Sequence, residues 1–498
     1  MGIPSSLYRP QLALLTDLYQ LTMAAGYHQA GVWEREAVFH LFFRKAPFAG
    51  GYTIAAGLAY ALDYLEHLAF DESDLEYLAG LTGADGAPLF PASFLDRLRG
   101  FRFDCDVDAV PEGTAVFPQE PLLRVRGPIA SAQLVETALL NIINFQSLVA
   151  TKAARVCLAA RGEPVIEFGL RRAQGIDGGL AASRAAYVGG CESTSNVLAG
   201  KLFGIPVKGT HAHSWVMLFG DELEAFRAYA AALPNNCVFL VDTYDTIEGV
   251  RHAVEVGKWL RERGQRLLGV RLDSGDLAYL SQEARRILDE GGFSEAKILA
   301  SNDLDEHVIE SLKKQDAKIT VWGVGTRIAT AYDQPALGGV YKLAATREPG
   351  GAWDYRIKVS EQSAKVTTPG ILGVRRYRGP DGFFAGDAIY DELLGPGGGD
   401  VTIVDPADPI RRKALPAGWP SEELLVPVMR GGRRVYDDPP LAETRARTRR
   451  ELEGFHAAIK RHLNPHSYPV GLESRLHALR TEMALKARDS RRPQSSAE

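Results

Sequence analysis

The central part of the chain alternates short apolar runs with segments of helical periodicity. The runs are VIEF (165–168), PVKG (206–209), VFLVD (238–242), LLGVRLD (267–273), KILASND (297–303), ITVWGVGT (319–326) and GVYKLAA (339–345). Between them, segments such as 245–264 and 277–292 carry apolar residues at helical spacing. This alternation predicts a parallel sheet with right-handed helical crossovers. So many units favour closure into a barrel, and an open doubly wound sheet is the structural alternative.

The flanking regions show other patterns. Residues 12–31 have the spacing of an amphipathic helix that begins at Thr16 or Asp17 and ends at Gly31. Residues 103–127 alternate and break at prolines, as the strands of a small sandwich or barrel do, and residues 130–160 predict a long buried helix. The expected domains are an N-terminal α+β domain (1–140), a parallel β/α barrel with the active-site rim (141–350), strands and turns that return to the N-terminal domain (351–440), C-terminal helices (441–490) and a disordered tail (491–498).

Composition narrows the class of protein. The chain has 498 residues, 46% of them hydrophobic and 24% charged, with a formal charge of -5 and a pI near 6.2. Nucleic-acid binders need a basic face, so we expect no nucleic-acid partner. No signal peptide and no apolar run of membrane-spanning length is found, and the four cysteines form no CxxC pair. We therefore expect a cytoplasmic protein without a membrane partner, a disulfide framework or a structural zinc site.

Polar residues or glycines follow six of the apolar runs. They are Arg171, His213, Asp242, Arg271 with Asp273, Asn302 with Asp303, and Gly325 with Thr326. Each has an ordinary explanation, because Asp and Asn cap helices and glycine turns chains. In a parallel barrel, however, the carboxyl ends of the strands lie on one rim, so six such ends together predict an active site.

The residue types suggest roles. The adjacent Arg171 and Arg172 offer planar hydrogen-bond donors that match a carboxylate or phosphate. The alternative is that both arginines simply lie in a solvated loop. GVGT (323–326) offers backbone amides to a phosphate. RLDSGD (271–276) suits ribose hydroxyls or a magnesium-bound diphosphate, or caps a helix. Asp242 has the chemistry to orient His213 as a nucleophile or base.

Taken together, EFGLRRAQG, DGGL, GTHAHSW, VDTYD, RLDSGDL and WGVGT, with TDLYQLTM near the start, resemble the nicotinate phosphoribosyltransferase family. The resemblance covers residues 12–345 and is less distinct after Lys358. It implies an irregular parallel β/α barrel of the type II phosphoribosyltransferase kind, with a second α+β domain built from the N-terminal region and part of the C-terminal region. It also implies that nicotinate and 5-phosphoribosyl 1-diphosphate are joined to nicotinate mononucleotide in the first step of NAD salvage, with ATP hydrolysis, Mg²⁺ and a homodimer with shared active sites.

The resemblance further implies residue roles. His213 would be phosphorylated by ATP and oriented by Asp242, with Ser214 beside it in the substrate site, whereas His211 receives no role. Phe168 and Tyr19 would sandwich the pyridine ring, with Tyr19 coming from the partner subunit. Arg171 and Arg271 would contact the carboxylate or ribose region, and Asp273 would bind ribose hydroxyls with Asn302 and Asp303 beside it. Gly325 and Thr326 would bind the 5′-phosphate. The candidates for the diphosphate are Arg44, Lys45, Lys358 and Lys365.

Three other classes share parts of this pattern. A nicotinamide-specific relative would share most of the rim. A phosphosugar isomerase or aldolase would require a Schiff-base lysine or a proton-abstracting carboxylate, and its activity would not depend on ATP. A non-catalytic scaffold would be expected to lose His213 or the pair Arg171 and Asp273, all of which are present.

Overall fold

The computed structural model describes residues 11–362, 365–395 and 399–489, and the chain divides into two compact units. Unit 1 comprises Met1–Ser147, Ala336–Pro439 and Arg450–Glu498, and unit 2 comprises Leu148–Pro335 and Pro440–Arg449. The tail expected at 491–498 lies outside the described residues.

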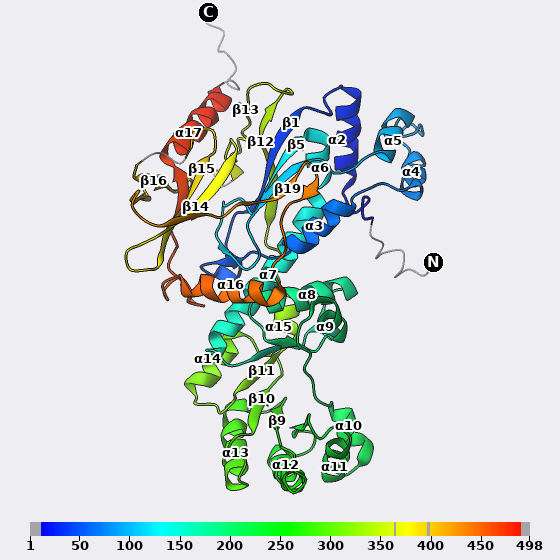
Figure 1. Cartoon of the computed structure of the whole chain (residues 1–498), viewed down its shortest axis with the longest axis vertical. Coiled ribbons are helices and arrows are strands. Elements are labelled where there is room, and N and C mark those ends of the chain that lie inside the picture. The colour runs from blue at the N-terminus through cyan, green and yellow to red at the C-terminus, as the bar shows by residue number, and fades with distance from the viewer. Residues whose placement is uncertain (1–10, 363–364, 396–398, 490–498) are drawn as a thin grey trace, which may run out of the picture. The chain divides into compact units, whose positions relative to one another are not determined.

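Unit 2 is built on a six-stranded parallel sheet (Figure 1). Its strands are β6 (Val165–Glu167), β7 (Ser193–Thr194), β8 (Val238–Leu240), β9 (Gly269–Leu272), β10 (Lys297–Ala300) and β11 (Val321–Val324), in the order β7-β6-β11-β10-β9-β8. Its helices are α8 (Ile176–Val188), α9 (Val197–Phe203), α10 (His213–Phe219), α11 (Glu222–Ala232), α12 (Thr246–Arg261), α13 (Leu277–Glu290), α14 (Glu306–Lys314) and α15 (Thr326–Ala329). The predicted parallel sheet with helical crossovers is confirmed.

The sheet curls but does not close. No ladder among the described residues joins β7 to β8, and PVKG contributes one parallel bridge, between Val207 and Thr194. Side chains span the remaining gap: His211 Nε2 accepts a hydrogen bond from the Leu240 amide at 3.3 Å, and Asn236 Nδ2 donates to the Gly209 carbonyl at 3.3 Å. The expected closed barrel is therefore a curled half-barrel. The physical reason is that PVKG is short and begins with proline, which has no N–H to donate to a ladder.

Unit 1 contains a seven-stranded sheet in which all pairs are antiparallel. Its strands are β1 (Glu36–Phe43), β3 (Asp106–Ala109), β5 (Leu123–Pro128), β12 (Gly339–Arg347), β13 (Asp354–Tyr355), β19 (Val426–Arg430) and β20 (Arg433–Arg434). GVYKLAA lies in β12, antiparallel to β1. The prediction that this run belongs to the barrel was wrong, because an apolar run alone does not reveal which sheet it joins.

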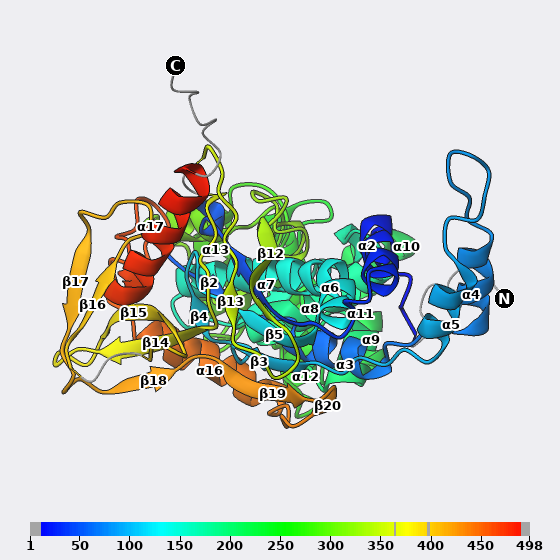
Figure 2. The same ribbon diagram turned by 90° about the horizontal axis from the view of Figure 1, so that it is seen from above.

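A second sheet of unit 1 has the order β17-β16-β21-β15-β14-β18. Its strands are β14 (Leu372–Arg378), β15 (Phe384–Asp391), β16 (Val401–Val404), β17 (Arg412–Leu415), β18 (Ser421–Glu423) and β21 (Val470–Glu473), and β2 (Thr53–Ile54) pairs separately with β4 (Ala115–Val116). Tyr377, Ala388, Val401, Ile403 and Leu415 form a core on this sheet. Helix α17 (Ser474–Asp489) follows β21 directly and lies beside β16 (Figure 2).

Seven α-helices of the described residues remain. They are α2 (Leu18–Gln29), α3 (Leu58–His67), α4 (Glu72–Ala79), α5 (Ala92–Arg99), α6 (Ile129–Leu134), α7 (Glu136–Ala160) and α16 (Leu441–Glu453). Asp17 is the N-cap residue of α2, one of the two starts predicted for that helix. Within the described part of the chain, every helix is too short or too polar to cross a bilayer.

Candidate active site

Arg271 and Asp273 occupy the centre of a hydrogen-bond network at the carboxyl end of β9. The Arg271 guanidinium donates from Nε to Ser301 Oγ at 2.9 Å, from Nη1 to Thr210 Oγ1 at 3.2 Å and from Nη2 to Asp273 Oδ1 at 3.2 Å. Ser301 Oγ also donates to Asp273. Residues 271 and 273 alternate in an extended segment and so project to the same side. The network therefore fixes one carboxylate and one guanidinium at the rim.

His213 faces this carboxylate. It is the first residue of α10, its Nε2 lies 3.8 Å from Asp273 Oδ2, and its Nδ1 lies 3.2 Å from Thr243 Oγ1. The imidazole is 40% exposed. The contact with Thr243 sets the ring orientation and leaves Nε2 accessible, as a nucleophilic imidazole requires. The structure thus brings His213, Arg271 and Asp273 together.

Asp242 has a different partner from the one predicted. Its Oδ2 accepts from the Asp273 amide at 3.0 Å and from Ser274 Oγ at 2.5 Å. The structure therefore corrects the expectation that Asp242 orients His213, because Thr243 makes that contact. The Asp242 carboxylate is instead directed at the loop after β9, where the Asp273 amide and the Ser274 hydroxyl donate to it. Asp242 Oδ1 is buried and has no hydrogen-bond partner among the described residues.

Phe168 lies against β11 because two glycines make room for it. Its amide donates to the Val324 carbonyl at 2.9 Å. A Cβ on Gly323 would stand 2.7 Å from the Phe168 ring, and one on Gly325 would stand 3.1 Å from the Phe168 carbonyl oxygen. The Arg271 guanidinium lies 5.7 Å from the ring centroid. Phe168 therefore joins the network, with Gly325 and Thr326 next to it at the start of α15.

Glu167 is a buried carboxylate that sequence reasoning missed. It accepts hydrogen bonds from the Gly169 amide, from Ser183 Oγ at 2.9 Å and from Thr194 Oγ1 at 2.7 Å. These bonds fix the start of the loop that carries Arg171. The glutamate belongs to the motif EFGL, but the sequence does not show that it is buried, because its partners Ser183 and Thr194 are distant in sequence.

The other predicted residues of unit 2 are exposed at the same edge of the sheet. The side chains of Arg171 and Arg172 make no hydrogen bond or ion pair with any described residue, which leaves both guanidinium groups available to a ligand. Asn302 and Asp303 follow β10, and Asn302 has a φ of 103°, a left-handed conformation that asparagine tolerates. Ser214 is exposed in the first turn of α10.

Five predicted residues lie in unit 1. Tyr19 is on α2 and 46% exposed, and its pKa is raised by partial burial and by Glu136. Arg44 follows β1, and the pKa of nearby Lys342 is lowered by burial and by the positive charges of Lys358 and Arg44. Arg44 and Lys358 are thus brought near Lys342. Lys45 and Lys365 are exposed, and the structure shows no contact that assigns them to this cluster.

His211, which had no predicted role, joins the 206–209 segment to β8. The side chain is 7% exposed, and burial, together with the charge of Arg271, lowers the pKa of its imidazole to about 4. The His211 ring must be neutral in this state, because Nε2 accepts a hydrogen bond from the Leu240 amide.

His211 should therefore make stability depend on pH. Its pKa is lower in the folded state, so the unfolded chain binds more protons between about pH 4 and pH 6.5, and this contribution to stability is lost as pH falls through that window. We expect urea denaturation to show a loss of about 2 kcal/mol from this residue between pH 7.5 and pH 5. His211→Gln keeps an acceptor for Leu240 and should remove that loss, whereas His67→Gln, at an exposed position, should not. Equal pH dependence in all three proteins would contradict this assignment.

Comparisons with known proteins agree with the geometry. Models for the nicotinate phosphoribosyltransferase N-terminal and C-terminal domains match residues 14–144 and 374–480. The chain is 45% identical over 469 residues to the nicotinate phosphoribosyltransferase of Bacillus subtilis, with 93% of each chain covered. It is 42% identical over 466 residues to one from Mycobacterium tuberculosis, covering 93% of this chain and 92% of that relative.

Solved structures show the same relationship. The crystal structure of human nicotinic acid phosphoribosyltransferase superimposes with a TM-score of 0.81 at 34% identity, covering 94% of this chain and 99% of that one. A nicotinate-nucleotide pyrophosphorylase from Pyrococcus furiosus, 22% identical with a TM-score of 0.62, covers 89% of this chain and 95% of that one, and shares the fold. Among the described residues, no group of three His, Cys, Asp or Glu side chains could hold a metal ion by itself. The chain belongs to the nicotinate phosphoribosyltransferase family and is an enzyme with that activity.

Proposed function

We propose that the network around Asp273 is where nicotinate displaces diphosphate from 5-phosphoribosyl 1-diphosphate to give nicotinate mononucleotide. The observation that carries the proposal is the convergence of Phe168, His213, Arg271 and Asp273 at one edge of the parallel sheet. Positive charge develops at the anomeric carbon as the diphosphate leaves, and a fixed carboxylate stabilises that charge. Asp273 is held by Arg271 and Ser301 for this task. The curled sheet supports the finer assignment to the type II phosphoribosyltransferase barrels.

Nicotinate would be recognised through its ring and its carboxylate. Phe168 supplies an aromatic face for the pyridine ring, and offset stacking of this kind stabilises a bound aromatic ligand. The exposed guanidinium of Arg171 offers the parallel donors that match a carboxylate. An amide presents one acceptor and no charge, so this arrangement favours nicotinate over nicotinamide. Ser214, Asn302, Asp303, Gly325 and Thr326 would line the ribose and 5′-phosphate region.

ATP coupling would run through His213. Nε2 of the imidazole attacks the γ-phosphorus of ATP, the bond between that phosphorus and the β–γ bridging oxygen breaks, and ADP departs. Thr243 at Nδ1 supports Nε2 as the attacking atom. The phosphorylated ring carries new charge and acceptor oxygens at the rim, which can order nearby groups over the substrate. Hydrolysis of the phosphohistidine after the transfer step would return the free enzyme.

The rim fits Mg²⁺ held jointly by the protein and the substrates. Mg²⁺ is commonly bound through one or two carboxylates plus substrate phosphates rather than by an all-protein cage. Asp242 Oδ1 is buried without a partner, and Asp273 lies next to it along the network. These two carboxylates would hold the ion. When bound, Mg²⁺ neutralises charge on the departing diphosphate. By the family resemblance, Arg44 and Lys358, with Lys45 and Lys365 by position only, are the candidates to bind the diphosphate.

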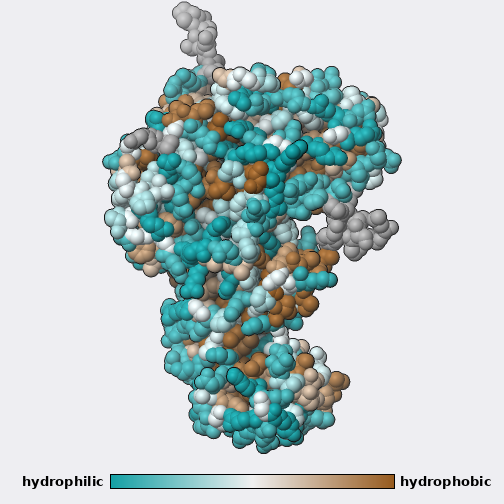
Figure 3. All heavy atoms as spheres, viewed as in Figure 1, coloured by the Kyte–Doolittle hydropathy of each residue, from teal (hydrophilic) through white to brown (hydrophobic). Residues whose placement is uncertain are grey.

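A homodimer in which Tyr19 of the partner completes the pyridine site is part of the proposal. Unit 2 exposes apolar side chains on two of its helices: Val197, Leu198 and Leu202 on α9, and Met217 and Leu218 on α10. Figure 3 shows hydrophobic areas on the surface of this unit. Clustered apolar exposure of this kind marks interaction surfaces. Tyr19 and Met23 of α2 are exposed as well. We place the enzyme in the cytoplasm, which suits its four free thiols, and we expect no nucleic-acid or membrane partner.

A mass-balance experiment tests the proposed reaction. With nicotinate, 5-phosphoribosyl 1-diphosphate, ATP and Mg²⁺, we expect nicotinate mononucleotide and ADP to accumulate together, because phosphorylation of His213 accompanies turnover. Nicotinamide in place of nicotinate should give a far slower reaction. Faster turnover of nicotinamide would contradict the substrate assignment, and product formation without ADP would contradict the coupling.

A further inference from the structure

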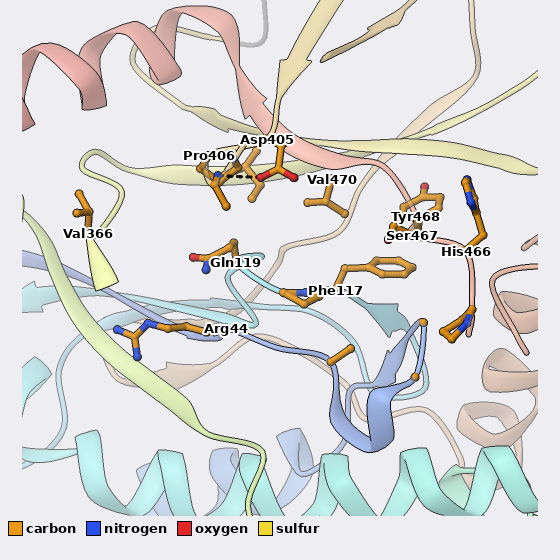
Figure 4. A pocket seen from close by; sticks show the side chains of 18 of the residues that line it. Arg44, Phe117, Gln119, Val366, Asp405, Pro406, His466, Ser467, Tyr468 and Val470 are labelled. Atoms are coloured by element: carbon orange, nitrogen blue, oxygen red, sulfur yellow. Dashed lines mark hydrogen bonds between the residues drawn. The ribbon is translucent and has the colours of Figure 1, made fainter. Parts of the chain in front are cut away.

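Unit 1 contains a cavity of about 310 Å³ whose wall includes Arg44, one of the residues named above as candidates for the diphosphate. Its walls come from the loop after β1, from Phe117–Gln119, from the turn at Asp405–Ala407, from residues 465–471 and from Arg480 of α17. Figure 4 shows Arg44 and Val366 toward one end, His466 toward the other, and Asp405 between them. The walls carry apolar side chains, among them Phe117, Ile389 and Val470, together with the charged side chains of Arg44, Asp405 and Arg480.

Arg480 is a partly buried cation without a carboxylate partner among the described residues. Its guanidinium donates from Nε to the Thr367 carbonyl at 3.3 Å and from Nη2 to the Val366 carbonyl at 3.0 Å. Burial lowers the pKa of this guanidinium, and no negatively charged group in the described part of the chain opposes that effect. Taking a charge out of water without an opposite charge is unfavourable. An anion in the cavity would provide the missing charge.

The other charged side chains around the cavity also favour binding of an anion. Arg44 lies against the Phe42 ring and forms no ion pair with a described residue. Asp405 is the one carboxylate on the described walls, and its Oδ1 is already used by its own turn, accepting from the amides of Ala407 at 2.8 Å and Asp408 at 3.3 Å. The cavity therefore has an excess of positive charge.

A neighbouring groove of about 640 Å³ extends this positive surface. It shares Asp405, residues 465–468 and Val470 with the cavity and adds four cations: Arg411, Arg412, Lys413 and Arg461. Arg411 pairs with Asp408 at 3.5 Å, whereas Arg412 and Lys413 donate to backbone carbonyls. A groove with mostly uncompensated cations raises the local concentration of anions.

We propose that this cavity binds a phosphate-bearing small molecule, with Arg480 as its main contact and the groove of Arg411–Lys413 and Arg461 holding further negative charge. Guanidinium groups match phosphate oxygens through parallel hydrogen bonds. Two sources share this chemistry: inorganic phosphate, which would fill the Arg480 end alone, and a nucleoside triphosphate, whose chain of phosphates would also reach the groove. Apart from Arg44, the contacts of the proposed site are separate from the residues assigned above to the reaction.

The test is calorimetric titration of the full-length enzyme, saturated with 5-phosphoribosyl 1-diphosphate so that the diphosphate subsite is filled. One arm uses inorganic phosphate, and the other uses ATP with a His213→Ala background that prevents phosphoryl transfer. In at least one arm we expect binding that weakens about tenfold to a hundredfold in Arg480→Ala, the range for a lost charge-assisted contact. The control is Lys486→Ala on the same helix, which pairs with Glu482 in solvent and should bind as the parent does.

The outcomes separate clearly. If Arg480→Ala does not fold, Arg461→Ala, at an exposed position of the groove, takes its place and should weaken ATP binding severalfold. Equal binding in the arginine variants and in Lys486→Ala overturns the proposal. Absence of binding in both arms once 5-phosphoribosyl 1-diphosphate is saturating also overturns it, because the anion would then belong to the diphosphate subsite. Catalytic activity is measured by the mass balance above, so a failure here is distinguishable from a failure of the proposed reaction.

Discussion

Replacing His213 with alanine should abolish the stimulation of turnover by ATP and leave a slow ATP-independent rate. The imidazole is the proposed phosphoryl acceptor, and Thr243 orients it from Nδ1 while Nε2 faces the rim. Alanine removes the nucleophile, but the carboxylate and guanidinium of the neighbouring network remain in place because their hydrogen bonds do not involve His213. The measurement is initial rates of nicotinate mononucleotide formation with and without ATP, and their ratio should fall to about one.

Two further variants sharpen this experiment. Thr243→Val removes the hydroxyl that contacts Nδ1 but keeps the nucleophile, so ATP stimulation should fall without disappearing. His67→Ala changes an exposed histidine of α3 and should behave as the parent enzyme does. Phosphohistidine formed from γ-labelled ATP should be absent in His213→Ala and reduced in Thr243→Val. Undiminished stimulation in His213→Ala would contradict the proposed route.

Much of the sheet and the rim could be predicted because the signals are local. Arg271 and Asp273 alternate at the end of an apolar run, which alone places both side chains on one side. His213 follows a run that ends at the same edge. The parallel sheet follows from strands that alternate with helices, and this alternation is visible over short windows of sequence.

The failures all depend on pairing between distant segments. Whether GVYKLAA joins the parallel sheet or lies beside β1 is decided by partners about 300 residues away in sequence, and the run is equally apolar in either place. The gap between Val207 and β8 is spanned by the side chain of His211, which no strand pattern predicts. Thr243 and Ser301 lie within the motifs VDTYD and KILASND, but the roles of their hydroxyl groups depend on hydrogen-bond partners that only the folded chain brings close.

Asp273→Asn should reduce kcat by about 10²- to 10³-fold, a loss of about 3 to 4 kcal/mol of transition-state stabilisation. Asparagine has nearly the same shape and can still accept from Arg271 and Ser301 through its oxygen, so the network should survive. What disappears is the negative charge that faces the cationic anomeric carbon and that, with Asp242, would hold Mg²⁺. Since Phe168 and Arg171 hold the pyridine ring in the proposed complex, KM for nicotinate should change little, and the loss should appear in kcat.

The matched control is Asp245→Asn. Asp245 lies near the carboxyl end of β8 and is the N-cap of α12, where its Oδ1 accepts from the Glu248 amide at 2.9 Å. Asparagine caps helices as well as aspartate does, so this variant removes a carboxylate after a neighbouring strand without removing a hydrogen bond. If both variants lose kcat equally, the general negative field of this edge is responsible rather than a positioned group. A change in kcat of less than about threefold for Asp273→Asn would be well below the effect of one transition-state contact. In that case the charge at Asp273 does not stabilise the transition state. The assignment of the reacting centre to this network would then be wrong.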